Sequence, residues 1–511
     1  MLQPRSPDVP QAAAPTAGPA RTAAVDDVRS ASSTASTSPQ DEQPRTTRGS
    51  LLTHFGPYPR CRRQRGKSPP RKTSSYFASA ANTWGGYSGT YADELSSSEH
   101  NTTEACNDSE RLQRLLFRLP PDLSGCLLQF SIDLQHKLRE TGLKGNVLLS
   151  PFFVASSLIM LLRGASGNTY DQVASALHME WDPSGTADRF EQMASDLFRD
   201  FERAKMRHLG LRLTCFMALF YDQSVPVFKQ YHRLQDTLCY FMDRRDFRNE
   251  SHQCRLTMDA LARANSSFSV PREQVFPPGS VGPDTLLVLL SSLRLEGRWK
   301  RSFAVSRGSA GCIRWMPAED KDGTRVLTMR CTAPFRTADC AELEATLVEV
   351  PYENPRNSMV ILLPTGPGGL AVLEEKLSAP LVLRCIDQLR DAGEVELSLP
   401  KFRIRHVTDL TQVLPLLGVH EAFTGEAQLD QLTPATGRGI HVSCVRHVAT
   451  VHVSHAGAQP ADARSRGGIS PAPAACAVAR RVAVDRPFMF LVLNRKPDLV
   501  LFLGSVTTVG V

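Results

Sequence analysis

The feature that most constrains the fold of this 511-residue chain is an alternating run near its end that stops abruptly. In Val445–Val453, VRHVATVHV, one set of alternate positions is mostly apolar, which predicts a strand with one buried face. The run ends at Gly457, and an Ala-, Pro- and Ser-rich stretch follows until strand character resumes at Pro487. Any fold for this chain therefore has to hold a long loop between two strong strands.

Composition divides the chain into two parts. Residues 1–115 are mostly Pro, Ala, Ser, Thr and charged residues, and such a segment buries too little apolar surface to offset the entropy of ordering it. We therefore predict a disordered, partly basic extension over 1–115. Residues 116–511 carry regular hydrophobic periodicity, which predicts one large globular domain.

Charge and motif searches exclude several function classes. The formal net charge of +7 is shallow for this length, so nucleic acid is not an expected partner. Only Arg60–Lys72, RCRRQRGKSPPRK, is strongly basic; it fits a nuclear signal, a polyanion patch or a processing site, although we favour a charged linker. No apolar run is long enough to cross a membrane. The chain has no P-loop, G-x-S-x-G, H-E-x-x-H or dinucleotide motif, so we expect no enzyme activity and no cofactor.

The twelve cysteines contain no C-x-x-C pair, so no zinc site is predicted. Three cysteines lie in apolar runs and are predicted to be reduced core residues: Cys215, Cys385 and Cys444. The sequence leaves open how four others pair, if they do: Cys106, Cys126, Cys331 and Cys340.

The globular part mixes helical and strand patterns. Leu127–Gly142 has apolar residues at helical spacing, and Ser150 followed by Pro151 is typical of a helix start. Leu211–Asp222 and Thr285–Phe303 are too apolar on both faces for surface strands, which predicts the interior of a sheet. This mixed order indicates an α+β protein with large sheets.

Short motifs occur in a fixed order along this part. They are Asn146-Val-x-x-Ser150-Pro151, Gly164-Ala-x-Gly167-Asn-Thr169-x-x-Gln172, Gly297-x-Trp299, Pro351-Tyr352, Leu399-Pro400-Lys-Phe402, Leu417-Gly418 and Val442-Ser443-x-Val445-x-His447-x-Ala449. Each motif alone is weak, but as a colinear set they make residues 116–511 resemble the serpins. The resemblance implies the serpin fold: α+β, three β-sheets, eight to nine helices, and an exposed reactive-centre loop at about 455–485.

The resemblance also implies a function, that of a suicide-substrate inhibitor of serine proteases. In serpins that inhibit, the protease cuts the reactive-centre loop, and the freed segment inserts as a strand into the largest sheet, which distorts the trapped protease. The serpin itself contributes no catalytic residue. The alternative is a non-inhibitory serpin that acts as a carrier, chaperone or protein-interaction module.

The first part of this loop, the hinge, has an unusual composition. Its residues are Gly457, Ala458, Gln459, Pro460, Ala461, Asp462, Ala463 and Arg464. By the family's register, Pro460, Asp462 and Arg464 would point into the core after insertion. Proline is essentially excluded from interior strands, and each buried ion costs several kcal/mol, so we expect impaired insertion. A one-residue slip would bury small side chains instead, but it would leave the proline problem in place.

Counting from both ends of the loop gives a window for the scissile bond. The window comprises Pro471, Ala472, Pro473, Ala474, Ala475 and Cys476. It contains no Arg or Lys, which argues against a trypsin-like target, whereas small residues suit an elastase-like pocket.

By the same resemblance, five residues belong to the region that governs opening of the largest sheet. They are Ser150, Phe153, Ser291, Trp299 and His447. Phe153 and Ser291 stand where the family usually has serine and asparagine. This indicates either altered control of sheet opening or a repacked apolar site. We predict no histidine metal site, because His447 and His452 face opposite sides of their strand.

Other expected partners are few. Arg199, Arg203 and Arg207 recur every four residues where some serpins bind sulfated glycosaminoglycans, but Asp200 and Glu202 lie among them, so we favour an ordinary ion-paired helix. We expect a monomer that binds neither nucleic acid nor membranes.

Signals for the compartment conflict. The N-terminus, MLQPRSPDVPQAAAP, has no apolar core and shows no signal peptide. Four glycosylation sequons, at Asn101, Asn107, Asn249 and Asn265, together with the habit of the family favour an extracellular protein, with the cytoplasm as the alternative. Residues 1–115 are then either an extension particular to this protein or the product of a wrongly chosen translation start that replaces a signal peptide.

Overall fold

The computed structural model describes residues 123–180, 182–208, 210–266, 273–305, 312–316, 324–366, 369–435, 439–455, 480–495 and 499–509. The expected extension over 1–115, the hinge from Gly457 to Arg464 and the window from Pro471 to Cys476 lie outside these ranges. Those predictions therefore stay predictions.

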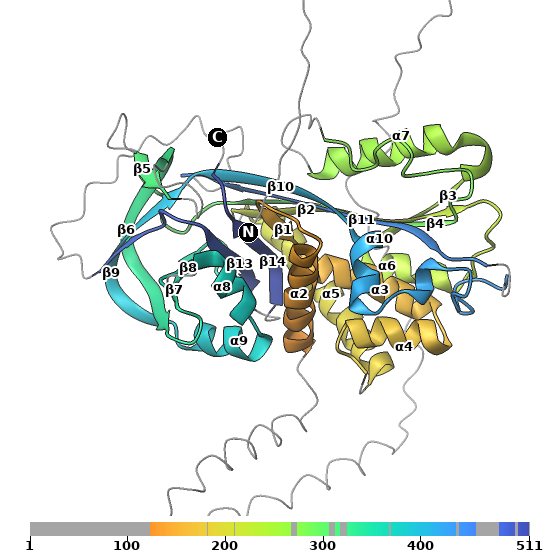
Figure 1. Cartoon of the computed structure of the whole chain (residues 1–511), viewed down its shortest axis with the longest axis horizontal. Coiled ribbons are helices and arrows are strands. Elements are labelled where there is room, and N and C mark those ends of the chain that lie inside the picture. The colour runs from red at the N-terminus through yellow and green to blue at the C-terminus, as the bar shows by residue number, and fades with distance from the viewer. Residues whose placement is uncertain are drawn as a thin grey trace, which may run out of the picture. The chain divides into compact units, whose positions relative to one another are not determined.

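Helices and strands alternate irregularly along the described chain (Figure 1). The helices are α2 (Leu123–Glu140), α3 (Pro151–Gly164), α4 (Gly167–Ala176), α5 (Pro183–Met206), α6 (Leu234–Leu238), α7 (Phe247–Ser266), α8 (Gly369–Lys376), α9 (Ala379–Asp387) and α10 (Leu410–Val413). The strands are β1 (Val147–Leu149), β2 (Leu211–Asp222), β3 (Tyr240–Arg245), β4 (Leu287–Gly297), β5 (Cys312–Trp315), β6 (Thr324–Cys340), β7 (Ala345–Pro351), β8 (Asn357–Pro364), β9 (Arg390–Pro400), β10 (Phe402–Asp409), β11 (Val442–Val453), β12 (Arg480–Ala483), β13 (Phe488–Asn494) and β14 (Leu499–Val506).

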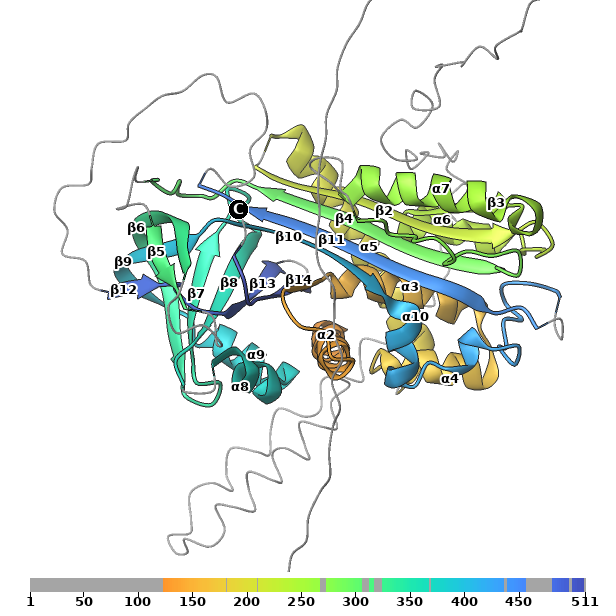
Figure 2. The ribbon, with the colours of Figure 1, turned by 45° about the horizontal axis from the view of Figure 1, so that its top comes forward.

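A five-stranded sheet, in the order β10-β11-β4-β2-β3, carries the two segments expected in a sheet interior. Helix α7 covers one face of this sheet, whereas α3 and α5 lie against the other (Figures 1 and 2). Because both faces are covered, β4 is apolar and buried along most of its length. The prediction of a buried interior strand at Thr285–Phe303 is confirmed over the bounds of β4.

The other strands form one nine-stranded sheet, in the order β1-β14-β13-β8-β7-β6-β9-β12 with β5 beside β6. Strand β6 is long enough to pair with β5 and β9 along one part and with β7 near its end. It therefore joins two of the three sheets expected for the fold into a single hydrogen-bonded network. Helices α2, α8 and α9 lie against this sheet (Figure 2).

One cysteine prediction is wrong. Cys385, at the end of α9, forms a disulfide with Cys340 at the end of β6, and their Cα atoms are 6.1 Å apart. Its apolar neighbours in sequence suggested a reduced core thiol, but α9 packs on the end of β6, which brings the two residues together across 45 positions of the chain. Cys444 is buried and belongs to no disulfide among the described residues.

We expect Cys385→Ala to destabilise the oxidised protein by about 4 kcal/mol at most, because the disulfide closes a loop of 45 residues in the unfolded chain. Urea unfolding with and without a reducing agent measures this difference. The matched control is Cys331→Ala, which removes a buried thiol from the same strand but keeps the disulfide, so its difference in stability from wild type should be the same with and without the reducing agent. If reduction destabilises wild type and Cys385→Ala alike, the disulfide does not form.

Candidate functional site

Strands β11 and β4 lie side by side as parallel neighbours, although long stretches of chain separate them. Their ladder runs from Val442 opposite Leu287 to Val451 opposite Leu295. We call this contact the β11–β4 seam (Figure 2). Since the two strands pair directly, the sheet is closed along the seam.

The chain leaves the seam at the C-terminal end of β11, and its next described residues belong to the other sheet. The described part of this segment ends at His455, and the chain reappears at Arg480 as the edge strand β12. A strand that followed β11 back into the seam would run antiparallel to both β11 and β4, and it would have a hydrogen-bonding partner on each side. The seam is therefore a geometrically suitable place for one additional strand.

Three polar residues, Ser150, Ser291 and His447, meet beneath the seam, and all three are buried. His447 of β11 lies directly opposite Ser291 of β4, with 2.7 Å between His447 Nδ1 and Ser291 Oγ. The backbone N–H of Ser150, just before α3, donates to His447 Nε2 at 3.0 Å. Because an N–H can only donate, Nε2 is the acceptor, and His447 is the neutral tautomer that carries its proton on Nδ1.

Local sequence explains why that N–H is available. Ser150 occupies the N-cap position of α3, and Pro151 starts the helix, so the Ser150 N–H has no partner within the helix. The Ser150 hydroxyl does not cap the helix but donates to the Leu501 carbonyl of β14. The residue thus links α3 to both sheets.

Phe153 lies in apolar surroundings, in the first turn of α3. It is fully buried, and its ring packs edge-on against Phe152 and against Phe198 of α5, with centroid separations of 5.1 and 6.0 Å. In the packing, Phe153 fills volume between α3 and α5. Its effect on sheet opening stays a prediction.

Trp299 contacts the C-terminal end of β11, where the reactive-centre loop would begin. Its indole N–H donates to the Ser454 carbonyl at 2.9 Å, and its ring stacks on Tyr352 with 4.5 Å between centroids. The same Tyr352 ring approaches Gly297, where an added Cβ would come within 2.5 Å of it. This contact explains the spacing of the Gly297-x-Trp299 motif.

The edge strand β12 is fixed by ion pairs that the sequence did not suggest. Arg480 binds Asp339 at 2.6 Å, and Arg481 binds Glu396 at 3.1 Å. These ion pairs hold the chain to β6 and β9 where it re-enters the fold.

The remaining predicted residues are dispersed. Asn249 is exposed near the start of α7 and Asn265 is half-buried near its end, whereas Asn101 and Asn107 lie outside the described residues.

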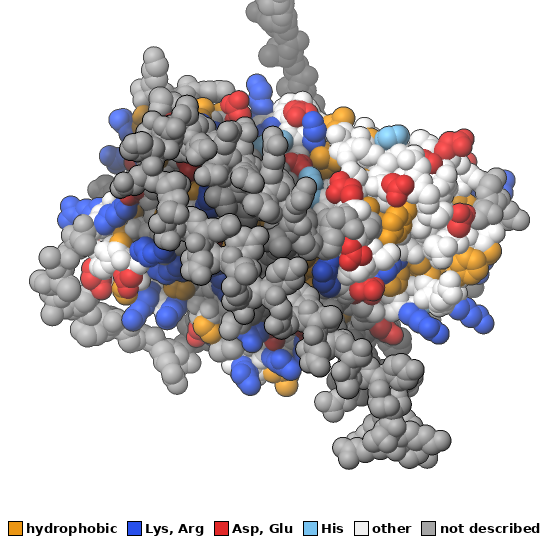
Figure 3. Space-filling model, turned by 90° about the horizontal axis from the view of Figure 1, so that it is seen from below, with side chains coloured by type: hydrophobic (Ala, Val, Ile, Leu, Met, Phe, Trp, Pro, Cys, Tyr) orange, Lys and Arg blue, Asp and Glu red, His pale blue; other side chains and the backbone are white. Residues whose placement is uncertain are grey.

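The charged side chains of the surface are mixed in sign. On the face shown in Figure 3, acidic side chains lie among basic ones. Arg199 and Arg203 of α5 pair with Asp196 and Asp200 at 2.8 and 3.3 Å.

Two features are absent from the described residues. No helix there is long and apolar enough to cross a membrane. No group of three or more His, Cys, Asp or Glu side chains in the same ranges is arranged to hold a metal ion.

Comparisons with known proteins agree with this fold. The model of the family "Serpin (serine protease inhibitor)" matches residues 127–509, so the chain belongs to the serpin family. Iris of Ixodes ricinus is 32% identical over 402 residues, which cover 75% of this chain and 98% of Iris. The leukocyte elastase inhibitor of Bos taurus is 27% identical over 394 residues, covering 76% and 99%. The crystal structure of uncleaved ovalbumin matches with a TM-score of 0.65 at 20% identity, covering 76% and 100%, and supports the fold alone.

We predict that protonation of His447 contributes to acid destabilisation. Burial, aided by nearby His406, lowers the pKa of His447 to about 3, against an ordinary value of 6.5. Between these values the unfolded chain binds a proton at this position and the folded chain does not, so stability falls as the pH falls from about 6.5 to 3. His447→Gln should flatten the slope of unfolding free energy against pH by up to about 1.4 kcal/mol per pH unit. Urea unfolding at several pH values measures this slope, and equal slopes would contradict the assignment.

Proposed function

We propose that this serpin is an inhibitor of serine-type endopeptidases that acts through insertion of its loop into the β11–β4 seam. The observation that carries the proposal is the closed seam itself. Strand β11 pairs directly with β4, and the chain leaves β11 straight into the segment that the family uses as bait. The architecture that a loop-insertion inhibitor needs before cleavage is therefore in place.

Opening the seam has a defined local cost. The parallel ladder between β11 and β4 and the Ser291–His447 hydrogen bond both cross the seam, so an entering strand has to replace them. The ladder bonds are recovered on both sides of the new strand. The bond of His447 to Ser291 is not recovered automatically, and a buried polar group left without a partner costs about 1–3 kcal/mol.

The hinge adds a larger cost. In the family's register, Pro460 offers no N–H to its neighbour, which orphans a carbonyl at about 1–3 kcal/mol. Asp462 and Arg464 would be taken out of water at several kcal/mol per ion before any gain from pairing with each other. Together these penalties are comparable to the stability of an ordinary domain, about 5–15 kcal/mol. We therefore propose that insertion stalls near Gln459 and that most encounters end with a cut loop and a released protease.

Cleavage of the wild-type loop near Ala472 by an elastase-like protease should leave Tm almost unchanged, because the cut segment does not complete insertion. The variant P460A/D462A/R464A should show a large rise in Tm after the same cut, together with an SDS-resistant complex with the protease. Calorimetry before and after cleavage, with gel electrophoresis of the mixture, measures both effects.

A matched control is A458S/A461S/A463S, which changes the same segment while leaving the proline and both charges in place. It should behave like wild type. A large rise in Tm for the wild type, or a triple alanine variant that forms no complex, would show that the hinge does not limit insertion.

The hinge also favours a second candidate function, that of a non-inhibitory serpin acting as a carrier, chaperone or interaction module. The two functions differ in one measurement. An inefficient inhibitor forms a small but stable fraction of covalent complex, and the alanine variant enlarges it. A non-inhibitory serpin is cut as an ordinary substrate by every protease that accepts the loop.

The expected target is an elastase-like serine protease. The window from Pro471 to Cys476 offers small residues and no Arg or Lys. A bovine relative carries the name leukocyte elastase inhibitor, which supports the same class of target. A second proposed partner is a sulfated glycosaminoglycan, which would bind the arginines of α5. Two of these arginines are already paired with aspartates, which weakens this proposal.

We further propose that the native protein is extracellular. The disulfide between Cys340 and Cys385 is typical of an oxidising compartment, and Asn249 presents an exposed sequon. We expect protein from its native source to lose mass on treatment with an N-glycosidase. Mass spectrometry before and after the treatment tests this. An unglycosylated chain with a reduced Cys385 would favour the cytoplasm.

A further inference from the structure

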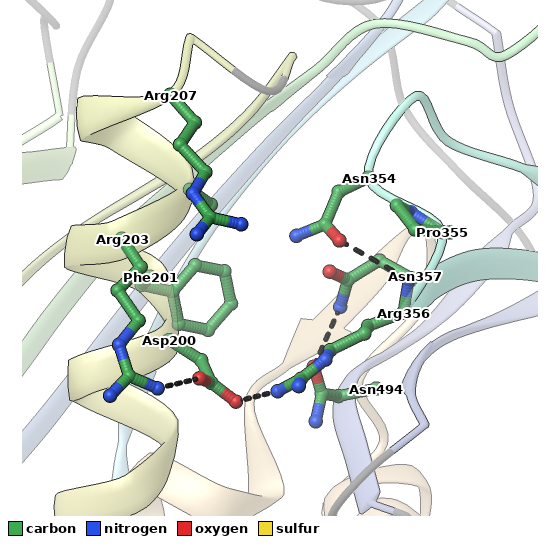
Figure 4. A pocket seen from close by; sticks show the side chains of 10 residues that line it. Asp200, Phe201, Arg203, Arg207, Asn354, Pro355, Arg356, Asn357 and Asn494 are labelled. Carbon is green, nitrogen blue, oxygen red and sulfur yellow. Dashed lines mark hydrogen bonds and ion pairs between the residues drawn. The ribbon is translucent and has the colours of Figure 1, made fainter.

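The disulfide between Cys340 and Cys385 lies beside a cavity of about 240 Å³. The end of β6, the turn that follows it and α9 line this cavity, and both half-cystines are among the lining residues. The cavity between α5 and the turn that joins β7 to β8, shown in Figure 4, has no cysteine among the described residues that line it. The first cavity therefore gives a small molecule a route from solvent toward the disulfide, and access of this kind is one factor that sets the rate of thiol exchange.

The disulfide joins the end of β6 to the helix that precedes β9, and these two strands hold β12. Cys340 is the last residue of β6, and Cys385 belongs to α9, which leads into β9 along the chain (Figure 1). Strand β9 provides the parallel ladder of β12. Strand β6 provides Asp339, the residue next to Cys340, which binds Arg480 of β12. The end of β12 that Arg480 occupies is thus fixed to both strands.

The contact between Asp339 and Arg480 depends on the geometry at the end of β6. Arg480 approaches the carboxylate of Asp339 with both terminal nitrogens, at 2.6 and 3.0 Å, and this contact lowers the pKa of Asp339. Thr346 of β7 donates its hydroxyl to Asp339 Oδ1 at 2.7 Å, and the next rung of the same ladder pairs Cys340 with Ala345. A two-point contact of this kind is sensitive to orientation, so a shift of the last rung weakens it.

We propose that this disulfide is a redox-sensitive restraint on β12 and that a dithiol reductant opens it. A thiolate of the reductant attacks one sulfur of the disulfide and forms a mixed disulfide, and the other cysteine leaves as a thiolate. The second thiol of the reductant then displaces the first cysteine, so the reductant ends as a disulfide and Cys340 and Cys385 end as two thiols. Two electrons and two protons pass from the reductant to the protein.

Reduction removes the covalent link between α9 and the end of β6. The end of β6 then moves relative to Arg480, whereas the β9 ladder and the ion pair of Arg481 with Glu396 stay in place. Because Asp339 is exposed, its ion pair with Arg480 is weak enough to be released by such a movement. Strand β12 lies where the reactive-centre loop would return to the fold, so its release frees the second end of the loop. Faster cutting of the loop rests on the proposed function, whereas the redox control of β12 does not.

Hydrogen exchange of the full chain, followed by mass spectrometry with and without dithiothreitol, measures the release of β12. In wild type, reduction should speed exchange of the amides of Arg480–Ala483 about fivefold, as expected for loss of a surface ion pair. Cys385→Ala should exchange at this faster rate in both conditions, and Asp339→Asn should be faster than wild type even with the disulfide intact. The matched control is Asp200→Asn, which removes the aspartate that pairs with Arg356 in Figure 4 and should behave like wild type.

The proposal is overturned if reduction leaves exchange of β12 unchanged, or if it speeds exchange of β4 and β12 by the same factor, which would mean a general loss of stability. Loop cleavage near Ala472 gives the functional readout. An elastase-like protease should cut Cys385→Ala faster than wild type, and Cys331→Ala, which keeps the disulfide, at the wild-type rate. If exchange of β12 responds to reduction but all three proteins are cut at one rate, the restraint is confirmed and its link to the loop is wrong. Trapping of the protease tests the proposed function separately.

Discussion

The parallel contact between β11 and β4 is the interaction on which the rest of this structure depends. The two strands belong to distant parts of the chain, so no turn holds them together, and the sheet is continuous only through their ladder and the side chains beneath it. Helix α7 covers one face, while α3 and α5 cover the other (Figure 1). The central sheet is thus closed along the seam, which is the place where we propose that the cut loop inserts.

The polar residues beneath the β11–β4 seam help to hold the seam in its closed arrangement. His447 is buried and neutral, and both ring nitrogens are hydrogen-bonded, one to β4 and one to the start of α3. A buried polar group that is fully satisfied in one arrangement resists change, because partial satisfaction costs more than an apolar contact. The nine-stranded sheet is stabilised by different interactions, which include the disulfide between Cys340 and Cys385 and the ion pair of Arg480 with Asp339.

Family membership and the composition of the hinge lead to opposite expectations about insertion of the cut loop. Membership in the serpin family and the closed seam favour insertion of the cut loop. By the family's register, we expect Pro460, Asp462 and Arg464 to oppose it, because the proline lacks an N–H and the other two side chains carry charges. The physical question for this protein is the rate of insertion relative to hydrolysis of the acyl-enzyme, since the same cut loop leads to a trapped or a free protease.

The sequence by itself determined the fold class, the buried strands and the start of α3, because hydrophobic period and the Ser150-Pro151 pair are local signals. It also marked Ser150, Ser291 and His447 as one region through family resemblance. Only the tertiary structure decided that these three share hydrogen bonds, that Cys385 is bonded to Cys340, and that Arg480 anchors β12. Such contacts join residues far apart in the chain, and their pairing depends on how helices and strands pack, which local patterns do not encode.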